Sequence, residues 1–186
     1  MPHLKKMLFI ITCLIVRPAS TENDDATSLY QQGIAKNKQG LLIQASILFT
    51  QAIDKNPEFA QAYYQRGLSF DGMGEKSQAI KDYKQAVDFK ASNLQPYLAL
   101  IQHFKTNTQY LAALIITDQL IENIPDQAAG GYYDKAQIYE LMNNSNLAIK
   151  AYELALKNTD EEMSEFNEQL IKKISHLKEM GNHKNK

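Results

Sequence analysis

The sequence predicts an all-α fold made of repeated helix pairs. The first observation is a period of 34 residues, which separates Gly33 from Gly67 and also Gly40 from Gly74. The second is a set of alanines that keeps this step, or one of 35: Ala45, Ala79, Ala113 and Ala148. A fixed period of this length is typical of helical repeat arrays, in which each unit buries its apolar face against the next. We therefore expect the function to reside in a surface rather than in reactive groups.

The period divides most of the chain into four units, which cover residues 26–59, 60–93, 94–127 and 129–162. In the first unit we expect helices over Thr27–Gln39 and Leu42–Lys55. Gly40 separates them, and Asn56-Pro57 ends the second one because proline cannot continue a helix. The second unit repeats this plan with a break at Gly74.

The last helix pair needs a cover for its apolar face, and residues 161–180 predict a capping helix. Its apolar stripe recurs at three- and four-residue steps and consists of Met163, Phe166, Leu170, Ile174 and Leu177. Thr159 and Glu162 have the spacing of a capping box at its start, and Gly181 is a natural stop. Residues 181–186 are expected to be frayed.

Small and aromatic positions recur in the same order in each unit. The second unit carries Tyr63, Gly67, Phe70, Gly74, Ala79, Tyr83 and Ala86. The first carries Gly33, Gly40, Ala45, Phe49, Ala52 and Pro57. The fourth carries Tyr132, Ala136, Tyr139, Ala148, Tyr152 and Ala155, and the third keeps Tyr97, Leu100, Phe104, Ala113 and Pro125. These units resemble the tetratricopeptide repeat family. The resemblance implies a right-handed superhelical α-solenoid of four antiparallel helix pairs with a C-terminal capping helix.

The third unit departs from the pattern where its two helices cross. Ile101 takes a small-residue position, and Thr117 takes an aromatic one. A bulky residue at a crossing pushes the helices apart or rotates them. Gly130 and Gly131 then open the fourth unit, and glycine is unfavourable inside a helix. We therefore expect the joint between the third and fourth units to be the loosest.

The resemblance also implies a concave groove lined by the first helix of each unit. The positions carried over are Tyr30, Ile34, Asn37, Gln61, Tyr64, Leu68, Asp71, Gln95, Leu98, Gln102, Lys105, Tyr133, Gln137 and Glu140. Four of them share one offset and form an apolar and aromatic ladder: Tyr30, Tyr64, Leu98 and Tyr133. Tyrosine offers a broad contact face and a hydroxyl group, so the ladder suits an extended peptide or a partner helix. The alternative is that these tyrosines pack on their own neighbours or on the capping helix.

Residues 1–20 differ from the rest of the chain. Two lysines precede an apolar run from Met7 to Val16, and Ala19-Ser20 follows. This plan is typical of a secretory signal peptide, because the run is shorter than the roughly 20 residues that span a bilayer. A retained membrane anchor, or lipidation at Cys13, is the alternative. Residues 21–25 are expected to form a polar tail, and the protein is expected to be periplasmic or secreted.

The sequence contains no constellation of reactive residues. Its histidines are isolated, and no metal-ligand spacing, phosphate loop or nucleophile motif is present. The formal net charge of −1, without a basic run, does not favour nucleic acid as a partner. The cations that would clamp a C-terminal carboxylate are also missing from the corresponding positions, which carry Tyr30, Ile34, Gln65, Gln95 and Ala99. We therefore expect a protein that is not an enzyme and holds no metal or cofactor.

The leading hypothesis is an exported scaffold or adaptor that binds a peptide or a partner protein in the groove, during assembly of the bacterial envelope. One alternative is a membrane-anchored assembly factor for a multi-subunit complex, resembling the tetratricopeptide proteins that help assemble photosystems or pili. Another is an enzyme-associated module without catalysis of its own. Homo-oligomerisation through a repeat face is compatible with each of these.

Overall fold

The computed structural model describes residues 19–184, and that part of the chain is helical without a strand. The helices are α1 (Ala19–Lys38), α2 (Leu42–Lys55), α3 (Ala60–Gly72), α4 (Lys76–Asp88), α5 (Gln95–Thr106), α6 (Tyr110–Asn123), α7 (Ala128–Leu141), α8 (Ser145–Lys157) and α9 (Ser164–Lys184). Two short 3-10 turns precede α7 and α9, at Pro125–Gln127 and Glu161–Met163.

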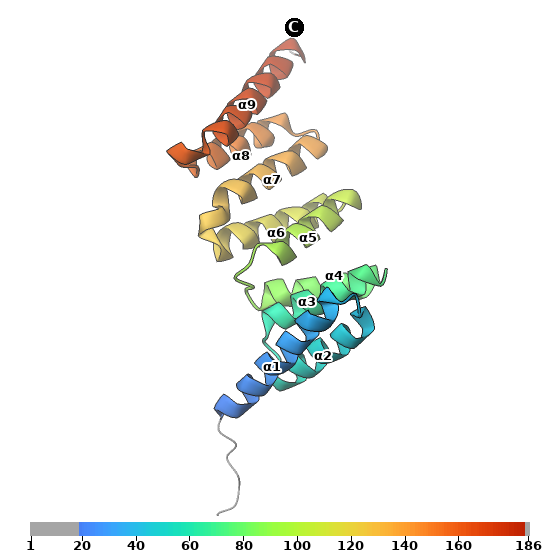
Figure 1. The fold of residues 1–186 in the computed structure, drawn as a ribbon. Helices are drawn as coiled ribbons and strands as arrows, with labels where there is room; N and C mark the ends of the chain where they lie inside the picture. The colour runs from blue at the N-terminus through green and yellow to red at the C-terminus, as the bar shows by residue number, and fades with distance from the viewer. Residues whose placement is uncertain (1–18, 185–186) are drawn as a thin grey trace, which may run out of the picture.

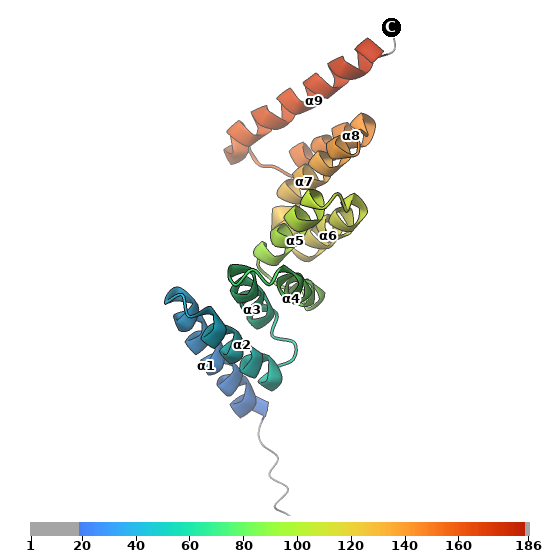
Figure 2. The same ribbon diagram turned by 90° about the vertical axis from the view of Figure 1, so that its right-hand side faces the viewer.

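The helices pair and stack in the order of the sequence. The pairs are α1/α2, α3/α4, α5/α6 and α7/α8, and α9 packs on α8 (Figures 1 and 2). One buried cluster extends from α3 to α7, and a second joins α7, α8 and α9. The predicted all-α solenoid of four helix pairs with a capping helix is thus confirmed.

Gly33 and Gly67 lie under aromatic rings of the paired helix. A Cβ atom at Gly67 would lie 2.6 Å from Cε1 of Tyr83, and one at Gly33 would lie 2.6 Å from Cε1 of Phe49. Side chains in a protein core leave no spare volume, so only glycine fits beneath these rings. The small residues therefore set the approach of the two helices, as the sequence predicts.

The third unit reverses the sizes of the two residues at this crossing. Ile101 of α5 and Thr117 of α6 are 2% and 0% exposed. The large side chain therefore lies on the first helix and the small one on the second. α5 and α6 contact each other less extensively than the helix pairs of the other units. The sparse contact between α5 and α6 agrees with the expectation that the bulky Ile101 pushes the two helices apart.

The expectation for the loosest joint is wrong. Gly131 of α7 is buried, and a Cβ atom there would lie 2.6 Å from Cγ1 of Ile121 in α6. Glycine at this position lets the third and fourth units pack closely instead of loosening them. Among consecutive helices of residues 19–184, α4 and α5 contact each other least. The loosest packing therefore lies between the second and third units.

Both ends of the described helices extend further than expected. α1 begins at Ala19, so residues 21–25 are helical rather than a polar tail. α9 continues past Gly181 to Lys184, since one glycine costs only about 1 kcal/mol of helix stability.

The start of the capping helix also differs from the expectation. The side chain of Asp160, not that of Thr159, caps the turn before α9, and it accepts a hydrogen bond from the Met163 backbone N–H at 3.2 Å. The Thr159 hydroxyl donates to the Leu156 carbonyl at 2.7 Å and so belongs to the end of α8. The predicted capping box is therefore replaced by an aspartate cap one residue later.

Candidate partner-binding groove

The first helices of the units share one face, which we call the first-helix face. Ser69 of α3 donates a hydrogen bond to Oδ1 of Asn37 in α1 at 3.0 Å. Lys105 of α5 donates to Oε1 of Gln137 in α7 at 2.7 Å. These two bonds join first helices of adjacent units, and the second one brings the predicted groove residues Lys105 and Gln137 together.

The same face continues onto the capping helix. Glu140 of α7 forms an ion pair with Lys173 of α9, with Oε2 and Nζ 3.3 Å apart. Lys173 lies 33 residues after Glu140 and so keeps the approximate repeat spacing beyond the last unit. The surface of α5 and α7 therefore continues onto α9, and Lys173 is a member of it that the sequence interpretation missed.

Each tyrosine of the predicted ladder packs against an aromatic ring within the chain. The ring centroids of Tyr64 and Tyr83 are 5.8 Å apart, and those of Tyr30 and Phe59 are 5.0 Å apart. Tyr133 contacts both helices behind it, with Tyr152 at 5.7 Å and Phe166 at 5.5 Å. The packing on neighbours and on the capping helix, which the sequence left as an alternative, is present.

Packing does not remove the ladder from the surface. All four members are half-buried, so each keeps part of its side chain accessible. Burial raises the pKa of the hydroxyl groups of Tyr30 and Tyr64, and both therefore remain neutral hydrogen-bonding groups at neutral pH. Because neighbouring rings fix their orientation, these tyrosines would lose little conformational entropy on binding a partner.

The remaining predicted groove residues divide by exposure. Leu68, Asp71, Gln95 and Gln102 are exposed, and Ile34, Asn37, Gln61, Lys105, Gln137 and Glu140 are half-buried. Lys105, Gln137 and Glu140 line one cavity of about 370 Å³. Asp71 and Gln102 line another of about 320 Å³. The prediction that these residues bind a partner is not tested by their positions and stays a prediction.

An ion pair that the sequence interpretation missed lies within the C-terminal half of this face. Nζ of Lys105 lies 3.8 Å from Oδ1 of Asp134 on α7, and the two side chains are 15% and 20% exposed. Burial raises the pKa of Asp134, and the positive charge of Lys105 opposes this shift. Asp134 follows Tyr133 directly, but only the packing of α5 on α7 reveals its partner.

Two of the sequence expectations concern chemistry and membranes. Among the residues that the structure describes, no group of three or more histidine, cysteine or acidic side chains could hold a metal ion. None of the helices within residues 19–184 is long and apolar enough to cross a membrane. The signal-like run Met7–Val16 and Cys13 lie outside the described residues.

The fold and the first-helix face define a helical-repeat solenoid with an extended surface. Residues 60–93 and 129–161 match the tetratricopeptide repeat. The second and fourth units thus match the repeat that the residue pattern indicates for them. Repeats of this class support a role in protein–protein interaction.

Several solved structures have a similar fold. PilF from Pseudomonas aeruginosa has a TM-score of 0.62 at 14% identity, over 88% of this chain and 72% of that chain. A crystal structure of MamA has a TM-score of 0.58 at 18% identity, over 87% of this chain and 94% of that chain. MamA from Desulfovibrio magneticus RS-1 has a TM-score of 0.56 at 14% identity, over 88% and 98% of the two chains. Identities this low show the fold alone, and no curated protein matches the sequence.

Proposed function

We propose that this protein is a non-catalytic scaffold that binds a peptide or partner protein on the first-helix face. The observation that carries the proposal is the ladder Tyr30, Tyr64, Leu98 and Tyr133, which repeats once per unit on the first helices and keeps part of each side chain accessible. Aromatic side chains held in place by neighbours, with amide and charged groups beside them, suit an extended ligand. The repeats and the fold support the same general role.

The proposal includes export and work in the bacterial envelope. Its support is the signal-like plan of residues 1–20, because that plan routes a chain to the secretory pathway. A membrane-anchored assembly factor would have the same repeats and would keep the N-terminal segment. Intact-mass measurement of the protein from its producing cells separates the two. Loss of roughly the first 20 residues supports the soluble exported form, and full retention supports the anchored form.

Affinity capture with matched variants tests the binding face. The double variant Tyr64→Ala, Leu98→Ala removes two adjacent members of the ladder, and we expect it to lose most of the captured partner. The control is Ile43→Ala, Ile47→Ala on α2, because these residues are 68% and 53% exposed and remove apolar surface outside the ladder. Undiminished capture by the ladder variant, or equal loss in the control, would contradict the proposal.

A further inference from the structure

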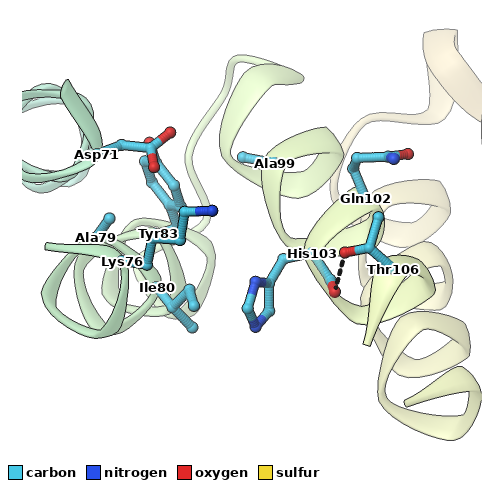
Figure 3. A pocket seen from close by; sticks show the side chains of 9 residues that line it. All are labelled: Asp71, Lys76, Ala79, Ile80, Tyr83, Ala99, Gln102, His103 and Thr106. Carbon is cyan, nitrogen blue, oxygen red and sulfur yellow. Dashed lines mark hydrogen bonds between the residues drawn. The ribbon is translucent and has the colours of Figure 1, made fainter. Parts of the chain in front are cut away.

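The loosely packed joint between the second and third units contains a cavity on the first-helix face. It has a volume of about 320 Å³ and lies between the pair α3/α4 and helix α5 (Figure 3). Its walls are formed by Asp71 of α3, by Lys76, Ala79, Ile80 and Tyr83 of α4, and by Ala99, Gln102, His103 and Thr106 of α5. The cavity is thus a widening of the proposed binding surface where adjacent first helices lack a mutual hydrogen bond among the described side chains.

Asp71 is the unusual charge on this face. Lys105 and Glu140 occupy the equivalent position in the next two units, and each has an ion partner, Asp134 and Lys173 respectively. Asp71 is exposed and forms no ion pair with the side chains that the structure describes. Figure 3 shows its carboxylate extending from α3 toward α5. A carboxylate in this position attracts a cation into the cavity.

The wall beside Asp71 is aromatic. Tyr83 lines the cavity together with Asp71. Burial and the nearby charge of Asp71 raise the pKa of the Tyr83 hydroxyl. Because Tyr83 is only 5% exposed, Asp71 is the group that a cation entering the cavity meets, and the tyrosine contributes to the wall. The ammonium group of Lys76 also points into the space between α4 and α5 (Figure 3), and Lys76 forms neither an ion pair with Asp71 nor a cation–π contact with Tyr83 among the described side chains.

We propose that this cavity receives a lysine or arginine side chain of the partner segment that lies on the first-helix face, with Asp71 as its recognition residue and Tyr83 in the wall beside it. The inference rests on the proposed function and adds the chemistry of one partner residue. Lys76 is exposed and stands at the N-terminus of α4, where a positive charge is unfavourable because of the helix dipole. A partner cation would displace it into water at little cost.

The direct test uses the full-length chain and capped amino acids as probes. The N-acetyl amide of arginine is titrated into ¹⁵N-labelled protein, and the shifts of the backbone amides of Asp71, Tyr83 and His103 are followed. We expect saturable shifts, an affinity about tenfold lower in Asp71→Asn, and a higher affinity in Lys76→Gln. The control Asp88→Asn removes an exposed carboxylate of α4 that does not line the cavity, and it should bind as the wild type does.

Several results would overturn the inference: equal affinity in Asp71→Asn, no saturable shift, or tighter binding of the N-acetyl amide of glutamate. Partner capture distinguishes this failure from failure of the proposed function. Full capture by Asp71→Asn, with loss in Tyr64→Ala, Leu98→Ala, would reject the cationic side chain and keep the scaffold. Full capture by the ladder variant, with Asp71-dependent arginine binding, would reject the ladder and keep the cavity.

Discussion

Arg66 of α3 binds Asp82 of α4 through two parallel hydrogen bonds, from Nε to Oδ2 at 2.7 Å and from Nη2 to Oδ1 at 2.8 Å. The Asp82 side chain is 4% exposed. Nη1 of Arg66 also donates to the Thr50 hydroxyl of α2 at 3.0 Å. One guanidinium group therefore ties together three helices of the first two units. Its planar fork matches the carboxylate in a way that lysine cannot reproduce.

Arg66→Ala should lower the free energy of unfolding by about 3–5 kcal/mol, because it leaves Asp82 buried without a partner. Urea unfolding followed by circular dichroism measures the change. The double variant Arg66→Met, Asp82→Leu should lose much less, since it removes the buried charge as well. If the single and double variants were equally destabilised, lost packing rather than the unpaired carboxylate would be the cause.

The adjacent glycines of α7 should respond in opposite directions to alanine. At Gly131 the new Cβ atom would lie 2.6 Å from Cγ1 of Ile121, so we expect a loss of about 1–3 kcal/mol from overpacking. At Gly130 nothing lies within 4 Å, so we expect a gain of about 0.5 kcal/mol from helix propensity. Urea unfolding compares the two variants. A stabilising Gly131→Ala would mean that the third and fourth units are not closely packed.

Hydrogen exchange should locate the loosest joint between the second and third units. The segment from Phe89 to Leu94 links α4 to α5, and Lys90 within it has a φ of 51°. Thin packing lowers the free energy of local opening, so its amides should exchange faster than those from Ile124 to Tyr132. Mass spectrometry of peptides after timed exchange provides the comparison. Faster exchange from Ile124 to Tyr132 would instead show that the joint between the third and fourth units is the loosest.

The raised pKa of Asp134 predicts a pH-dependent effect of Asp134→Asn. The folded state holds this proton at pH values where the unfolded state, with a pKa near 3.8, has lost it. The contribution of Asp134 to stability therefore falls as pH rises from about 4 through the raised pKa. The difference in free energy of unfolding between Asp134→Asn and the wild type should therefore favour the variant more at pH 7 than at pH 4. Urea unfolding at both pH values checks this, and a relative loss at pH 7 would show that the charged pair with Lys105 outweighs burial.

The sequence contains enough information for the repeat architecture. A small residue and an aromatic ring stand at the positions of Gly67 and Tyr83 in the first, second and fourth units, because their helix pairs pack in the same way. The spacing alone therefore predicts the helix pairs. The exchange of sizes between Ile101 and Thr117 is also visible in the sequence, because both residues stand at positions of the repeat. The sequence therefore predicts altered packing where the helices of the third unit cross. It does not predict that both residues are buried at that crossing, with the large side chain on α5 and the small one on α6.

The rest depends on contacts between distant segments. Arg66 and Asp82 carry no motif, and their pairing follows from the crossing of α3 and α4. The same holds for Lys105 and Asp134 across α5 and α7. Gly131 was interpreted through helix propensity, whereas its effect depends on Ile121 of the neighbouring unit. Residue pattern thus predicts the elements, and packing between units decides which joints are tight and which charges are paired.

The central claim is that a partner binds the first-helix face. Site-specific photocrosslinking in the producing cells tests it most directly, with a photoreactive residue at Gln102 of α5 or, as control, at Gln78 of α4. Both side chains are exposed, and Gln102 lies on the proposed surface whereas Gln78 lies on a second helix. If a partner binds this face, position 102 should yield a discrete crosslinked partner that is absent from position 78. A crosslink from position 78 alone, or the same product from both, would contradict it.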